Sequence, residues 1–541
     1  MAKGHGQLSF DEFDDKYFPR PPETGFDRVI TRAISRRGVL GLMGAGVGAL
    51  AVSPGAALAG KDGCFDFEAV AANTADTVTV PRGFKWHVVL SWGDPLWPDA
   101  PPFDPQTRGT GASQERAFGD NNDGMHLFER GGRTILAVNN EYTNLAIIHG
   151  NRKDGKPVNA DDIRKSKAAH GVTICEVQQI GGKWSIIPGS PFTRRITPET
   201  PMQITGPAAG HDMLKTKAGP TGTRSLGTWA NCANGATPWG TYLTCEENFN
   251  GYYSTRDKSF KPTAEMIRYG IAHRDWGYQW AMADDRFDVA KNPNEPNRSG
   301  YVVEIDPFDP DSTPKKRTAL GRFKHENAEL VINSDGRIVV YMGDDERGEF
   351  IYRFVSDEKY IEGGDNTGLL DNGTLYAARF NDDQTGKWQA LTPETTGMPG
   401  KAEICLFTRI AASAVGATTM DRPEWIAANP LKAEVMCALT HNRKRGRNKT
   451  NAGGDPMILN GPNPRARNRY GQIVRWRPDG GDHAADSFTW DLFVLAGNPL
   501  VHTDERKGSA NVTPANMFNS PDGLKFDSSG MLWIETDGYI T

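Results

Sequence analysis

Residues 132–141 read Gly-Arg-Thr-Ile-Leu-Ala-Val-Asn-Asn-Glu, a short β-rich run that begins at a turn glycine and ends in polar and acidic residues. Similar runs begin at residues 240 and 336, and weaker copies begin at residues 433 and 530, so successive copies lie 96 to 108 residues apart. Val, Ile, Thr, Tyr and Trp fit a pleated strand better than a helix. Similar strands at nearly constant spacing are typical of a repeat architecture. The sequence therefore predicts an all-β protein, a β-propeller with large insertions in each blade.

The polar ends of these runs are candidate functional residues. If each run is the inner strand of its blade, we expect the ends to meet at one mouth of the central channel. The ends in question are Asn139–Glu141, Cys245–Glu247, Asp344–Glu346 and Thr536–Asp537. Converging carboxylates repel one another unless cations lie between them. A metal site is one interpretation, and ordinary strand-ending turns, which Asp, Asn and Gly also favour, are the other.

Composition excludes several classes of protein. The 541 residues are 38% hydrophobic and 24% charged, with 60 Gly, 35 Pro and a net charge of −5. The hydrophobic fraction is that of a folded chain, and the Gly and Pro content is high for a helical protein because both residues break helices. The slightly negative net charge argues against a nucleic-acid partner, since phosphate contacts need a basic surface. The sequence has no phosphate-binding loop, no H-E-x-x-H and no G-x-S-x-G, which argues against a P-loop nucleotidase, a zincin and an α/β-hydrolase. None of the six cysteines forms a C-x-x-C pair, which argues against a zinc ribbon.

The N-terminal region has the pattern of an export signal. Ser35-Arg36-Arg37-Gly38 precedes a Gly- and Ala-rich apolar run, Val39–Leu58. Paired arginines before a weakly apolar stretch predict a twin-arginine signal, with a short membrane anchor as the alternative. We therefore expect a signal region at 1–59 and a β-propeller domain at 60–541. The predicted partner is the twin-arginine export machinery, the location is periplasmic or secreted, and no stable membrane insertion is expected.

Two insertions carry their own predictions. The stretch Thr263–Arg286 contains a predicted helix. The basic run His441–Lys449, His-Asn-Arg-Lys-Arg-Gly-Arg-Asn-Lys, is interpreted as a solvated loop.

Long motifs spread over the chain resemble PhoX-type alkaline phosphatases. They are AGHDMLKT (209–216), NCANG (231–235), TPWGTYLTCEENFNGY (237–252), GRFKHEN (321–327), MDRPEW (420–425) and NSPDG (519–523). The resemblance covers almost the whole chain after the signal region. It implies a six-bladed propeller that hydrolyses phosphate monoesters outside the cytoplasm to scavenge phosphate. It also implies a cofactor of Fe³⁺ and Ca²⁺ joined by an oxo bridge.

The resemblance further implies roles for individual residues. Cys245 matches an iron-binding thiolate, and the other metal ligands matched are Glu326, Glu424 and Asp522. Glu246 and Glu247 flank the cluster and are further candidate ligands, and strand alternation would place Cys245 and Glu247 on one face.

Arg422 matches the arginine that contacts substrate phosphate, so Arg422 and Glu424 are the candidate catalytic pair. These residue types fit the chemistry, because carboxylates suit hard cations, a thiolate suits iron and arginine offers phosphate a planar fork.

Two alternatives to an exported phosphomonoesterase are a calcium-dependent lactonase or esterase propeller, and a non-catalytic calcium-stabilised propeller or inactive truncated relative. The chain stops at Thr541, just past the fifth run, whereas members of the family continue for about one more repeat. We therefore expect about five repeats, a gap between the first and the last, and low activity. A closing strand supplied by the segment around Phe65–Val80 would remove that gap.

Overall fold

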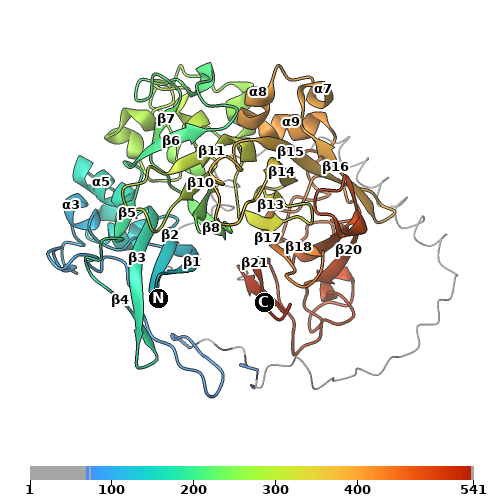
Figure 1. The fold of residues 1–541 in the computed structure, drawn as a ribbon, viewed down its shortest axis with the longest axis horizontal. Helices are drawn as coiled ribbons and strands as arrows, with labels where there is room; N and C mark the ends of the chain where they lie inside the picture. The colour runs from blue at the N-terminus through green and yellow to red at the C-terminus, as the bar shows by residue number, and fades with distance from the viewer. Residues whose placement is uncertain (1–66, 68, 72, 74, 538–541) are drawn as a thin grey trace.

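The computed structural model describes residues 67, 69–71, 73 and 75–537, and its elements are mostly strands in large sheets (Figure 1). The predicted signal region, residues 1–59, lies outside the described residues. No helix in the described part of the chain is both long and apolar enough to cross a membrane.

The first two sheets are formed by the N-terminal half of the chain. The first has the order β1-β2-β3-β4 with β5 paired to β3, and its strands are β1 (Asn122–Arg130), β2 (Arg133–Asn140), β3 (Gly171–Ile180), β4 (Lys183–Ile186) and β5 (Arg194–Ile196). The second has the order β7-β6-β11-β10-β9-β8, with β6 (Pro201–Thr205), β7 (Arg224–Leu226), β8 (Asn231–Ala236), β9 (Tyr242–Glu246), β10 (Val302–Ile305) and β11 (Lys315–Arg317).

The third sheet joins two groups of strands through a β16–β20 pair, and a two-stranded sheet follows. The order of the third is β12-β13-β14-β15-β16-β20-β19-β18-β17. Its strands are β12 (Glu329–Ile332), β13 (Arg337–Gly343), β14 (Ile351–Lys359), β15 (Gly373–Phe380), β16 (Thr385–Ala390), β17 (Pro423–Ala428), β18 (Val435–Leu439), β19 (Gln472–Pro478) and β20 (Ser487–Leu495). The last sheet pairs β21 (Pro521–Phe526) with β22 (Leu532–Thr536).

Helices are short and lie in the insertions. They are α3 (Gly111–Gln114), α4 (Leu145–Ile148), α5 (Ala160–Ala168), α6 (Ala264–Arg268), α7 (Pro393–Thr396), α8 (Lys401–Leu406) and α9 (Thr408–Ala414). The helix predicted within 263–286 is present as α6, but it is short: it ends after Arg268, before Gly270, whose positive φ of 71° does not continue a helix.

The recurring runs that begin at residues 132, 240, 336 and 433 are β2, β9, β13 and β18, and each is the second strand of its group. Their prediction as strands is confirmed, whereas their prediction as inner strands is wrong. β13 shows the reason, since it is paired on both edges and almost fully buried and therefore needs a continuous apolar sequence. The neighbouring edge strands are shorter or more polar, as in β8 (Asn-Cys-Ala-Asn-Gly-Ala), and lack that signal.

These edge strands meet one another in sequence order around the middle of the molecule. β1 packs against β8, β8 against β12, β12 against β17, and β17 against β21. Figure 1 shows the sheets set around this centre, from the blue β1–β4 group through green and yellow to the red β20 and β21. The described residues between 67 and 94 form no strand.

Apolar clusters hold neighbouring sheets together. One cluster joins the second and third sheets and includes Leu243, Cys245, Val302 and Val340, all fully buried. Another packs β17 and β18 against β21 through Ala427, Met436 and Leu524. Packing on both sides fixes each sheet relative to the next, and this fixes the position of the edge strands.

Candidate metal centre

Acidic side chains and one cysteine converge at one end of the edge strands. Three groups have ligand atoms within 4.8 Å of one another: Asp123 with Glu141 and Cys232, Cys232 with Glu247 and Glu326, and Glu326 with Asp345 and Glu424. Because Cys232 and Glu326 are each shared by two groups, the groups form one continuous cluster. The Asp522 carboxylate also acts electrostatically on Glu141, Glu326 and Glu424. We call these eight residues the acidic cluster.

The same backbone arrangement recurs in five places around the centre. An edge-strand residue pairs with a residue at the end of the second strand, and the edge strand then carries one extra residue before regular pairing resumes, which is a β-bulge. The five pairs are Asn122 with Asn140, Asn231 with Glu246, His325 with Asp344, Pro423 with Leu439 and Pro521 with Thr536.

The residue that follows the paired residue on each strand is the one that matters for the site. On the edge strands these residues are Asp123, Cys232, Glu326, Glu424 and Asp522. On the second strands they are Glu141, Glu247, Asp345, Thr440 and Asp537. Each repeat thus offers up to two ligands, and eight of these ten residues make up the acidic cluster.

Hydrogen bonds show that the five arrangements are equivalent. In each arrangement, the second-strand residue that follows the paired residue donates its backbone N–H to a carbonyl on the edge strand. The acceptor is the residue directly before the paired edge-strand residue. The bonds run from Glu141 to Asn121 (2.9 Å), Glu247 to Ala230 (2.8 Å), Asp345 to Lys324 (3.1 Å), Thr440 to Arg422 (3.2 Å) and Asp537 to Ser520 (3.0 Å).

Four of these acceptor residues are held in the left-handed backbone region, with φ of 40° at Asn121, 51° at Ala230, 58° at Arg422 and 48° at Ser520. Such a conformation costs a non-glycine residue roughly 1–2 kcal/mol and persists only where the surrounding structure imposes it. Repetition of this strain beside the acidic cluster indicates a functional constraint rather than a local accident.

The cluster is electrostatically unfavourable as a set of free carboxylates. Burial, together with neighbouring carboxylates, raises the pKa values of Glu141, Glu247, Glu326, Glu424 and Asp522 well above their usual range. The pKa of Asp123 is raised to about 6, first by burial. Burial and the adjacent carboxylates also raise the pKa of the Cys232 thiol. Cations in the cluster would reverse these shifts by favouring the charged forms.

The donor set fits a metal centre. Glu247 is 2% exposed, and its Oε1 has no hydrogen-bond partner among the described residues. A buried carboxylate oxygen without a donor is rare in folded proteins, and a cation is a partner that satisfies it. Carboxylate oxygens with a single sulfur suit hard cations together with one metal that accepts thiolate.

Of the predicted ligands, the structure brings Glu247, Glu326, Glu424 and Asp522 together, but not Cys245. Cys245 lies on β9 with its side chain in the apolar cluster beside Leu243 and Val302. The cysteine in the acidic cluster is Cys232 on β8, with Sγ 3.2 Å from Glu326 Oε1 and 3.5 Å from Asp123 Oδ2. The predicted thiol, Cys245, thus lies outside the acidic cluster, and the thiol that lies among its carboxylates is that of Cys232.

Glu246 is likewise not in the cluster. Its Oε1 lies 2.6 Å from Lys316 Nζ, and its Oε2 accepts the backbone N–H groups of Gly300 and Tyr301. This carboxylate is already neutralised and fully buried, so its role is structural. Glu247 lies one residue beyond the end of β9, where strand alternation no longer decides the direction of a side chain.

Arg422 does lie beside Glu424, but its present partners are carboxylates. Its Nε and Nη2 donate to both oxygens of Asp345 at 2.8 and 2.7 Å, and Nη2 is 2.9 Å from Glu424 Oε1. β17 begins at Pro423, so the left-handed backbone at Arg422, rather than strand alternation, brings the two side chains together.

Sequence reasoning did not assign Asp123 or Cys232 to the site, and it named Glu141 and Asp345 only as ends of the recurring runs. A usable signal was present in the spacing of the pairs. Ligand-type residues on the two strands of a repeat are 15 to 19 residues apart, as in Cys232 and Glu247 or Glu326 and Asp345.

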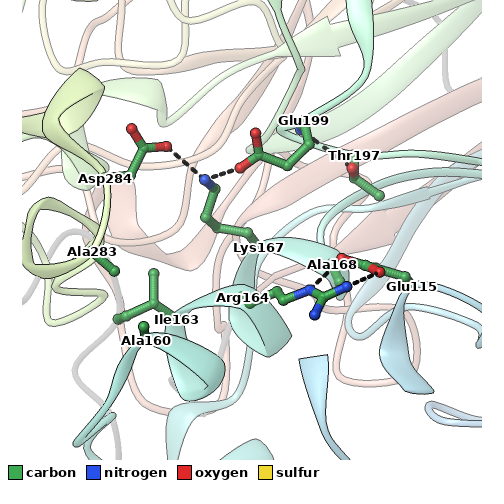
Figure 2. A pocket seen from close by; sticks show the side chains of 10 residues that line it. All are labelled: Glu115, Ala160, Ile163, Arg164, Lys167, Ala168, Thr197, Glu199, Ala283 and Asp284. Carbon is green, nitrogen blue, oxygen red and sulfur yellow. Dashed lines mark hydrogen bonds and ion pairs between the residues drawn. The ribbon is translucent and has the colours of Figure 1, made fainter. Parts of the chain in front are cut away.

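A separate cavity of about 150 Å³ lies between α5 and the loops that carry Glu199 and Asp284 (Figure 2). Its charges are paired with one another, because Lys167 Nζ contacts both of these carboxylates and Arg164 Nη2 lies 2.6 Å from Glu115. None of its lining residues belongs to the acidic cluster.

Comparisons with known proteins show the family of the chain. The profile of the family described as alkaline phosphatase PhoX matches residues 65–541. A solved structure, Pseudomonas fluorescens PhoX in complex with vanadate, a transition state analogue, is 51% identical with a TM-score of 0.84, and the match covers 87% of this chain and 83% of that one. The search of curated proteins gave no match. The chain therefore belongs to the PhoX family of alkaline phosphatases and is a phosphoric monoester hydrolase.

Proposed function

We propose that the acidic cluster is the active site of this phosphomonoesterase and that it holds Fe³⁺ and Ca²⁺. The observation that carries the proposal is the convergence of seven carboxylates and Cys232 from five equivalent repeats onto one place next to Arg422. Ca²⁺ takes oxygen ligands, so the carboxylates suit it, whereas a thiolate beside them suits iron. When bound, such cations supply Lewis acidity that offsets charge on a phosphoryl group.

The residues in and around the acidic cluster would have different roles. The carboxylates fix the cations, and the strained bulges hold the carboxylates in place. Arg422 would turn its planar fork toward the phosphoryl oxygens of the ester once cations take up the charge of Asp345 and Glu424. The groups that approach the phosphate would be positioned before the reaction starts, which is how electrostatic stabilisation of a transition state becomes large.

The thiol in the cluster favours the phosphatase over the alternatives considered from sequence. A lactonase or a calcium-stabilised binding propeller needs neither a thiolate nor an arginine fork beside its metal ligands. Cys232 lies in the acidic cluster, and Arg422 lies beside it.

For the fold, we propose a β-propeller in which β1, β8, β12, β17 and β21 are the innermost strands of successive blades. The packing of each of these strands against the next supports this. Export through the twin-arginine route to the periplasm or medium remains a prediction.

Glu424→Gln tests the proposed site. The change keeps the size of the side chain but removes one negative charge from the cluster, so turnover of p-nitrophenyl phosphate should fall by at least about 100-fold with secondary structure unchanged. Glu434→Gln is the matched control, because Glu434 is similarly buried, directly before β18, but pairs with Arg475 and Arg477. Unchanged turnover in Glu424→Gln would remove Glu424 from the site.

A further inference from the structure

Thr440 is the exception among the five equivalent second-strand positions. The other four are acidic: Glu141, Glu247, Asp345 and Asp537. Thr440 has the same backbone setting, since it follows the paired residue Leu439 and donates its N–H to the carbonyl of Arg422 at 3.2 Å. The repeat therefore presents a neutral hydroxyl where its counterparts present a carboxylate.

The Thr440 hydroxyl is buried and unsatisfied. The residue is fully buried, and its Oγ1 has no hydrogen-bond partner among the described residues. Burying a hydroxyl without a partner is unfavourable, and such groups are few in native proteins. The unpaired Oγ1 therefore leaves one hydrogen-bond donor available to a partner outside the described residues.

Basic residues are frequent in the chain next to Thr440. Arg422 precedes the paired Pro423 on the edge strand, and the loop that follows Thr440, residues 441–470, contains eight Arg and Lys residues and one acidic residue, Asp455. A hydrogen bond from Arg445 Nε to Asp421 Oδ1, 2.6 Å long, joins this loop to the residue directly before Arg422. The four repeats with an acidic residue at this second-strand position suit cations there, whereas a hydroxyl beside Arg422 suits a negatively charged ligand.

We propose that Thr440 is a substrate-binding residue whose Oγ1–H donates a hydrogen bond to a non-bridging phosphoryl oxygen of the ester, beside the guanidinium of Arg422. The inference rests on the proposed function. It also explains why this second-strand position lacks a carboxylate, since an acidic side chain here would repel the phosphoryl group.

The test uses the metal-loaded enzyme, with inorganic phosphate and vanadate as probes. Thr440→Val removes the hydroxyl at constant shape, and it should weaken inhibition by both anions by about 10-fold or more, since a hydrogen bond to a charged group is lost. Metal content and melting temperature should stay as in the wild type. Thr440→Ser should restore anion affinity, and Thr440→Asp should weaken it further than Thr440→Val does.

Thr193→Val is the matched control, because Thr193 is also buried with an unpaired Oγ1 but lies outside the acidic cluster. Wild-type anion affinity in Thr440→Val would overturn the inference, and so would a joint loss of anion affinity and metal. If Thr440→Val does not fold, Thr440→Ala serves in its place. Turnover of p-nitrophenyl phosphate by the wild-type enzyme, measured in parallel, tests the proposed function separately from the role of Thr440. A wild-type enzyme without turnover would contradict the proposed function, whatever Thr440→Val does.

Discussion

Replacing Cys232 and Cys245 one at a time should have opposite effects. Cys232 Sγ lies among carboxylates, 3.2 Å from Glu326 Oε1, whereas Cys245 is fully buried in an apolar cluster. Cys232→Ala removes the only sulfur from the acidic cluster, so iron should be lost and turnover should fall by at least about 100-fold. The fold should persist, because the Cys232 side chain is not part of an apolar core cluster.

Cys245→Ala removes one well-packed heavy atom. A cavity of that size costs about 1 kcal/mol of unfolding free energy, and in a chain this long the melting temperature should fall by only about 1–2 °C. Metal content and turnover should be retained. The assays are metal analysis, p-nitrophenyl phosphate turnover and thermal unfolding of both variants. Loss of iron in Cys245→Ala together with its retention in Cys232→Ala would refute the reasoning.

Three further predictions concern the substrate, protons and export. Arg422→Lys keeps the charge but loses the fork, so turnover should drop by roughly 10- to 100-fold with metals intact, and loss of metals would show that Arg422 supports Asp345 and Glu424 instead. Metal-free protein should lose stability as the pH rises from about 4 through 6. The reason is that folding raises the pKa of Asp123 from 3.8 to about 6, so the folded state binds a proton that the unfolded chain has released. Denaturant titrations at several pH values measure this, and a rise in the free energy of unfolding over that window would contradict it. Changing Arg36 and Arg37 to Lys should leave the full-length protein in the cytoplasm on cell fractionation, and undiminished export would exclude the twin-arginine route.

The sequence predicted the strands that are paired on both edges better than those beside the site. β13 is apolar along its whole length because it is buried, so its pattern is visible. β8 and β12 are short and partly polar because they border the cluster, and no alternation marks them. The same difference explains why the sequence pointed to Cys245 rather than Cys232 as the thiol of the site. Cys245 is in the more strand-like motif, yet that position on β9 faces the core.

The directions of the ligand side chains depend on local backbone geometry, which the sequence does not show. The bulges and left-handed residues at Asn121, Ala230, Arg422 and Ser520 set the direction of the ligands, and only structure reveals such conformations at non-glycine residues. Carboxylates that follow a recurring run were predictable as a group. Which of two adjacent acids enters the cluster, as with Glu246 and Glu247, depends on partners such as Lys316 that lie far away in the chain.

Metal analysis of the purified protein before and after chelation, with p-nitrophenyl phosphate turnover measured on the same samples, tests the central claim most directly. The account predicts bound iron and calcium, loss of both metals and turnover on chelation, and recovery of turnover when both are restored. Full turnover by protein that contains neither metal would contradict the assignment of the acidic cluster as a metal-dependent active site.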